Sequence, residues 1–340
     1  MRVATLIVLF LVSLYSDVHA IVPKNRTFSL DDFQRIDVPA FEVLPVEILK
    51  PGKIKCLGGN RVLTVEKYAQ EMVVFRDFKT GKTHKFVSKG RGPRECLNIR
   101  DITTYGDSVY FSSIDDRKIL VFHLDAKKGI VYSHEYNYDP WCIRAIPLPS
   151  GGILCLPMID GRFIRIIGGK TENLGSFPPL KGAKVALNNT SVQSMIAATS
   201  DGIHLCSAYQ TIDCIEIYSN DFKSMLRLEG PAKYVAKVKV SETPAGTSFS
   251  IEPTINTFNA LSVSDKGFIV GYIGQLFKEG DEVPRNIGDL LSFDWEGNCL
   301  KRFHLPEEVV YLDIDWEEGR MIGVTGGDVP KLVSSKLDLN

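Results

Sequence analysis

The sequence has no strong excess of charge of either sign and no charged block. Its 340 residues include 40 basic and 41 acidic side chains, which gives a net charge of −1, and no run of five or more like charges occurs. Nucleic-acid binding and attachment to an anionic membrane surface both depend on clustered basic residues. We therefore expect neither a nucleic-acid partner nor a polybasic membrane patch.

The sequence also lacks the short motifs of the common catalytic sites. After residue 20 it contains no Gly-x-Ser-x-Gly elbow, no His-Glu-x-x-His pair, no phosphate-binding glycine loop and no Cys-x-x-Cys pair. We therefore assign no catalytic residue, no metal and no cofactor. A hydrolase or lyase that assembles its site from distant segments stays open as an alternative, because such a site leaves no local motif.

One acidic segment resembles the start of a calcium loop. Asp313 and Asp315 alternate with Ile314, but Glu318 stands where such a loop needs glycine and Val324 where it needs glutamate. We interpret this segment as a strand whose acids point outward.

No apolar run is long enough to span a bilayer. The longest extends over about 13 residues, from Val3 to Tyr15, against the roughly 20 that a spanning helix needs. It follows Met1-Arg2 and precedes Val18-His19-Ala20, whose small residues are typical of a signal-peptidase site. We predict a cleavable signal peptide over residues 1–20, cleaved after Ala20, and export to the periplasm or the extracellular medium.

Cysteine is sparse and odd in number, with seven in the chain. In an exported protein at least one should be unpaired. Cys206 and Cys214 flank a predicted hairpin turn, as do Cys142 and Cys155, so either pair could be cross-strand neighbours. Buried free thiols are the other possibility, because cysteine packs as a small hydrophobe.

The clearest positive feature is a repeat of glycine turns. Each of six glycines lies between two segments that are rich in β-branched and aromatic residues, and the intervals are 46–65 residues. They are Gly59, Gly106, Gly152, Gly202, Gly267 and Gly319.

Each repeat predicts four short strands. In the second unit they are residues 99–105, 108–114, 118–124 and 129–136, and in the fourth 192–199, 202–208, 214–218 and 224–228. No segment has a sustained helical period. The sixth unit has only three strands before the chain ends, and Phe33 to Phe41 is predicted to supply the missing outer strand. The expected fold is an all-β, six-bladed β-propeller that forms a single domain over residues 21–340.

Three segments resemble a known family. Gly90-Arg91-Gly92-Pro93-Arg94-Glu95-Cys96 is similar to a turn of the TolB-like six-bladed β-propeller proteins exported by Bacteroidetes. Phe293-Asp294-Trp295-Glu296-Gly297-Asn298 and Gly271-Tyr272-Ile273-Gly274 resemble two further segments of that family. Arg94 and Cys96 depart from it, because glycine and tyrosine are usual there. The resemblance implies the fold and periplasmic placement, and no activity.

Propeller geometry places the connections between units on the same face as the loops between the second and third strands. The connections Lys89–Asn98 and Pro231–Thr257 and the loops 115–117, 160–162 and 275–288 should share that face. Long loops on a rigid scaffold are common binding sites. The mouth of the central channel on that face should present the residues Arg91, Arg94, Asn98, Trp141, Arg144, Gln193, Asn259 and Tyr311.

These residues predict a binding module. We expect a monomer that binds a small polar ligand, or a protein or peptide partner, at this mouth and loop face. Amide caps at strand ends are the alternative explanation for the polar residues there.

Overall fold

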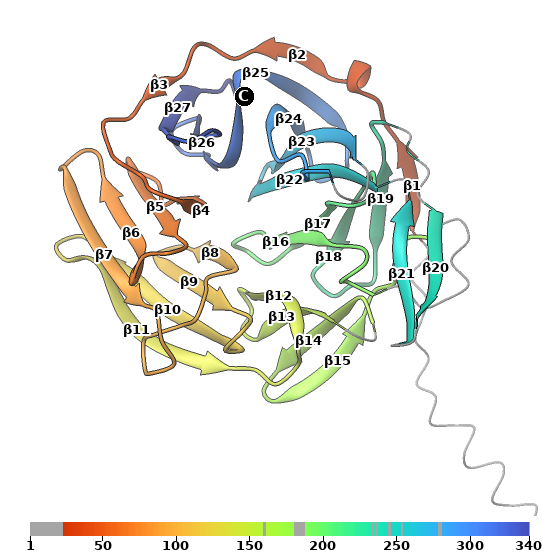
Figure 1. Ribbon diagram of the computed structural model, residues 1–340, viewed down its shortest axis with the longest axis horizontal. Coiled ribbons are helices and arrows are strands. Elements are labelled where there is room, and N and C mark those ends of the chain that lie inside the picture. Colours follow the sequence, from red (N-terminus) through yellow and green to blue (C-terminus); the bar gives the residue numbers. More distant parts are fainter. Residues whose placement is uncertain are drawn as a thin grey trace, which may run out of the picture.

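The computed structural model describes residues 23–339 apart from 159–160, 180–187, 233, 235–236, 244–245, 253 and 278–280, and it describes no side chains within 237–252. The predicted signal peptide lies outside the described residues. Sheets are arranged around a central axis, as in a β-propeller (Figure 1). The described chain contains a single helical segment, the short 3₁₀ turn η1 (Leu30–Asp32).

Four sheets follow one another along the chain, and in each the strands are antiparallel neighbours in sequence order. The first contains β4 (Pro51–Cys56), β5 (Arg61–Glu66), β6 (Glu71–Asp77) and β7 (Lys82–Ser88). The second contains β8 (Asp101–Tyr105), β9 (Ser108–Ser113), β10 (Lys118–Asp125) and β11 (Gly129–Asn137). The third contains β12 (Cys142–Pro147), β13 (Ile153–Pro157), β14 (Phe163–Ile167) and β15 (Lys170–Leu174). The fourth contains β16 (Ser194–Ala198), β17 (His204–Tyr209), β18 (Cys214–Ser219) and β19 (Met225–Glu229), and β1 (Lys24–Thr27) adds to β19 in parallel.

The rest of the ring is one eight-stranded sheet. It runs through β22 (Thr254–Ser264), β23 (Gly267–Phe277), β24 (Ile287–Phe293), β25 (Cys299–Asp315), β26 (Arg320–Thr325), β27 (Leu332–Lys336) and β3 (Glu42–Val43). A further strand, β2 (Gln34–Asp37), pairs in parallel with β25. Between β19 and β22 the chain forms a separate hairpin of β20 (Lys237–Thr243) and β21 (Gly246–Glu252), which lies outside the ring in Figure 1.

The six repeated glycines occupy turns that L side chains rarely adopt. Their φ angles all lie between 54° and 157°. A Cβ on Gly152 would come within 2.3 Å of the carbonyl oxygen of Ile166, and one on Gly267 within 2.1 Å of that of Phe293. The repeat is visible in the sequence because the backbone conformation at these positions favours glycine.

The predicted closing strand is wrong in its residues. Phe33 packs its ring on Phe293, with 5.2 Å between centroids, and Gln34–Asp37 pairs with residues 301–304 of β25. This contact draws residues 33–37 onto β24 and β25, away from β27. It is β3, the two residues that directly follow Phe41, that pairs with β27.

Neighbouring sheets pack face to face through apolar side chains. Leu63 and Phe75 of the first sheet meet Phe111 and Phe122 of the second in one buried cluster. The third and fourth sheets share a similar cluster that contains Phe163 and Tyr218, whose rings lie edge to face at 5.4 Å. All seven cysteines are free thiols, and six of them are buried.

A buried ionic network lies between the third and fourth sheets. Glu216 is completely buried and accepts hydrogen bonds from Arg227 at 2.8 Å, from the Tyr209 hydroxyl at 2.8 Å and from the Tyr218 hydroxyl at 2.7 Å. Arg162, 1% exposed, approaches the same carboxylate at 3.7 Å. Arg162 was predicted in a loop of the binding face. Its side chain is instead buried. Its charge is matched by this carboxylate, because an unpaired buried charge would be costly.

Candidate functional site

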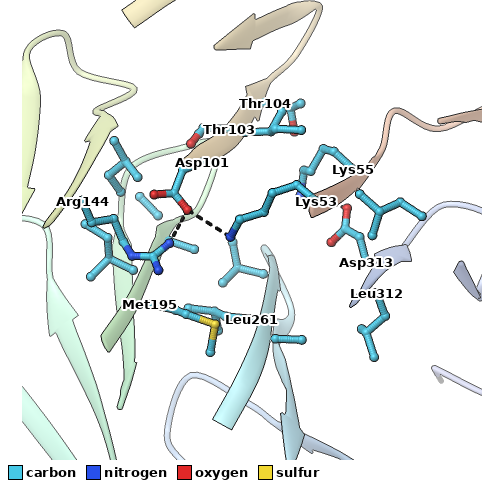
Figure 2. Close-up of a pocket in the computed structure, with 18 of the residues that line it drawn as sticks. Lys53, Lys55, Asp101, Thr103, Thr104, Arg144, Met195, Leu261, Leu312 and Asp313 are labelled. Carbon is cyan, nitrogen blue, oxygen red and sulfur yellow. Dashed lines mark hydrogen bonds and ion pairs between the residues drawn. The ribbon is translucent and has the colours of Figure 1, made fainter. Parts of the chain in front are cut away.

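The centre of the ring holds a cavity of about 200 Å³. Its walls come from β4, β8, β12, β16, β22 and the second half of β25, so residues far apart in the sequence meet there (Figure 2). A cavity of this size takes a molecule smaller than a typical drug.

Two lysines enter the cavity from one face of β4. Burial alternates along this strand, so Ile54 and Cys56 are buried while Lys53 and Lys55 share the other face. The Lys53 side chain is 33% exposed and that of Lys55 22% exposed. Both lysine side chains are therefore only partly buried.

Each lysine has one carboxylate partner on a different strand. The Nζ of Lys53 lies 3.5 Å from Oδ1 of Asp101 on β8, and the Nζ of Lys55 lies 3.0 Å from Oδ2 of Asp313 on β25. Asp313 also accepts a hydrogen bond of 2.9 Å from the backbone N–H of Cys56. The prediction that the acids of this segment point outward is wrong for Asp313 and Asp315, whereas Glu317 and Glu318 are exposed. Asp313 and Asp315 are buried, because their charges are matched by Lys55 and by Arg320.

Asp101 is shared between two cations. Arg144 of β12 donates to the same Oδ1 atom that faces Lys53, and Figure 2 shows the two cations reaching this oxygen from different strands. Arg144 is only 4% exposed. At this end of the cavity one negative charge therefore faces two positive charges.

The pKa of Lys53 is lowered to about 8. Burial is the main cause, because it disfavours the charged ammonium. Asp101 opposes this shift, whereas Arg144 and Arg100 add to it by repulsion. Lys53 therefore loses its proton far more readily than an ordinary lysine.

Another part of the wall is apolar. Met195 of β16, Leu261 of β22 and Leu312 of β25 line the cavity, and Figure 2 shows Met195 and Leu261 together below the charged groups. The cavity thus combines a cationic region with a hydrophobic surface. A ligand with an acidic group and an apolar part would match both.

Three of the predicted mouth residues line this cavity: Arg144, Asn259 and Tyr311. The Asn259 amide accepts a hydrogen bond of 3.1 Å from Gln210. The Tyr311 hydroxyl accepts one of 3.4 Å from Lys67. Asn259 lies two residues after the long connection Pro231–Thr257. Its amide group also donates to the carbonyl of Arg285, in the loop 275–288, at 3.4 Å.

Four other predicted residues gather at a second hollow on the outer surface. Arg91 and Trp141 line it. Asn98 donates to Asp115 of its rim, and the backbone N–H of Arg94 donates to Glu135 at 2.9 Å. Trp141 is largely exposed, with the Arg117 guanidinium 4.9 Å from its ring centroid. Gln193 is exposed and is not among the described residues that line either hollow.

Sequence reasoning missed Lys53, Lys55 and Asp101. The available signal was a charged Lys-x-Lys pattern in an inner strand, where buried apolar residues are the rule. The prediction considered only the first residue of each inner strand and thus passed over the positions that follow it.

The described residues contain no group of three or more His, Cys, Asp or Glu side chains placed to hold a metal ion. Among the same residues no helix is long and apolar enough to cross a membrane.

Comparison with known proteins gives similarity at the level of structure. No protein-family model matches the sequence, and no curated protein matches it. A member of the DUF4221 family from Bacteroides vulgatus is similar in structure over 88% of this chain and 96% of its own, with a TM-score of 0.58 and 10% identity. A Bacteroides fragilis protein that is thought to be exported is similar over 92% of this chain and 99% of its own, with a TM-score of 0.52 and 11% identity. The similarity is one of fold. At such identities it assigns no activity.

Proposed function

We propose that the protein is an exported six-bladed β-propeller that binds a small polar ligand in its central cavity. The observation that carries the proposal is the set of partly exposed ammonium groups inside the cavity, beside an apolar wall. Charged groups are costly to bury, so charges held inside a cavity commonly serve to bind a ligand.

The proposed count of six blades rests on a division of β25. Its residues up to His304 pair with β24, and those from Val309 onward pair chiefly with β26. Division of the long strand between these parts would make two four-stranded blades from the eight-stranded sheet, with β2 at the edge of the first and β3 in the second. Six inner segments then surround the cavity, as its lining residues support.

Export rests on residues 1–20 and on the TolB-like resemblance. The Bacteroides fragilis protein of similar fold, itself thought to be exported, agrees with this placement. We propose cleavage after Ala20, a single domain from residue 21 and a monomer in the periplasm or the medium.

A binding role is preferred to catalysis by the make-up of the cavity wall. None of the described residues that line it is a histidine, which is the most frequent proton-transfer group in enzymes. The outer hollow with Trp141 would be the contact for a protein or peptide partner on the same loop face.

The proposal predicts binding that depends on the cavity volume. A panel of butyrate, butyramide, butylamine and glucose at millimolar concentration would be measured by saturation-transfer NMR. We expect at least one compound to bind the wild type and to bind at least tenfold more weakly to Ala197→Phe, which places a ring in the cavity. Lys85→Met, an exposed change on β7, should bind like the wild type.

Circular dichroism would check that Ala197→Phe is folded. If it is not, Ala197→Val replaces it, because this smaller change also fills part of the same cavity. The proposal is wrong if no compound binds the wild type, or if binding is equal in wild type and cavity variants.

A further inference from the structure

The charges around the cavity do not balance. Among the described residues, Lys53, Lys55 and Arg144 line it together with two carboxylates, Asp101 and Asp313. The cavity therefore carries a surplus of one positive charge within a protein whose net charge is −1.

The surplus lies at the Lys53 end. Lys55 and Asp313 form a one-to-one pair at 3.0 Å, whereas Asp101 serves both Lys53 and Arg144. Arg100 adds a further positive charge that repels Lys53 and Arg144. An anion beside Lys53 would relieve this repulsion.

The exposed fraction of each basic side chain indicates which of them an anion could contact. The Arg144 side chain is buried and its guanidinium is already engaged by Asp101, so it holds the carboxylate in place rather than facing a ligand. Lys53 and Lys55 project from the same face of β4 and are partly exposed. The two ammonium groups are the cations available to a ligand.

We propose that the cavity binds a small carboxylate with a short apolar tail. Its carboxylate lies against Lys53 and Lys55, and its tail lies against Met195, Leu261 and Leu312. This assignment rests on the proposed function and names the ligand class of the same site. A single negative charge equals the surplus, and a hydrocarbon tail gains by leaving water for the apolar wall.

Protonation of Lys53 is linked to this binding. The titratable groups near it are Asp101 of β8, Arg100 just before that strand and Arg144 of β12, with Lys55, Tyr311 and Asp313 on the same cavity wall. A bound anion favours the ammonium form, so the ligand and a proton bind together. Above pH 8 the free protein loses that proton, and affinity for the carboxylate should fall roughly tenfold for each pH unit.

The test uses three molecules of similar size and different charge: butyrate, butyramide and butylamine. Calorimetric titration of the full chain at pH 7 should show butyrate binding at least tenfold more tightly than the other two. Lys53→Met should weaken butyrate binding at least tenfold, and Lys85→Met should leave it unchanged. Repeated at pH 9, the wild-type affinity for butyrate should be about tenfold lower.

Lys55→Met provides a second variant if Lys53→Met does not fold. The carboxylate assignment is overturned if butyramide or butylamine binds as tightly as butyrate, or if Lys53→Met and Lys55→Met keep the wild-type affinity. In those cases the binding function survives whenever Ala197→Phe still abolishes the signal. Absence of binding by all three compounds overturns the carboxylate assignment, and absence of glucose binding as well overturns the binding function.

Discussion

Glu216→Ala should lower the free energy of unfolding by about 3–5 kcal/mol. The carboxylate is completely buried and is the shared partner of Arg162 and Arg227. Its loss leaves two guanidinium groups without water and without a counter-charge, and it also removes the acceptor of two tyrosine hydroxyls. Urea denaturation followed by circular dichroism measures the effect.

Glu172→Ala is the matched control. Glu172 also pairs with an arginine, Arg165, at the shorter distance of 2.6 Å, but its side chain is 55% exposed. An exposed pair is worth less than about 1 kcal/mol because water solvates both charges. Equal losses for the two variants would contradict the buried-network account.

Lys53→Met should make the protein more stable at pH 7, by about 1–2 kcal/mol after allowance for the partial exposure of the ammonium. The pKa of Lys53 is lowered to about 8 in the folded protein. The unfolded chain therefore binds the proton more tightly, and the charged lysine opposes folding. Methionine removes that charge and keeps a side chain of similar length.

The sign of this effect on stability can be checked by measuring unfolding at several pH values. Between pH 8 and about pH 10.5 the unfolded state binds more protons than the folded state, so Lys53 makes the stability of the wild type rise with pH over this window. The advantage of Lys53→Met should therefore shrink by pH 10, whereas Lys85→Met should match the wild type throughout. A Lys53→Met variant that is less stable than the wild type at pH 7 would show that Lys53 is a structural ion-pair partner.

The propeller fold could be predicted because its determinants are local. Each turn glycine has a positive φ, and the strands between the turns carry their own β pattern. In the second unit the predicted strands differ from the observed ones by two residues at most. The continuous strand β25 was not predicted. The fifth and sixth units were expected to be separate, whereas β25 runs through the boundary between them without a turn.

The candidate site was predictable only in part, because its interactions connect distant residues. Arg144, Asn259 and Tyr311 could be placed from the position of each inner strand. The partner of Asp313 could not, since Lys55 lies near the other end of the sequence. The burial of Arg162 could not be predicted for the same reason, because Glu216, whose carboxylate matches its charge, belongs to the next sheet.

The pKa of Lys53, read from the NMR shifts of lysine side chains during a pH titration, tests the central claim most directly. Lys53→Met would identify its signal. The account predicts a pKa near 8 for the free protein and a higher value in the presence of butyrate. A pKa near the ordinary 10.5 that butyrate does not change would contradict it.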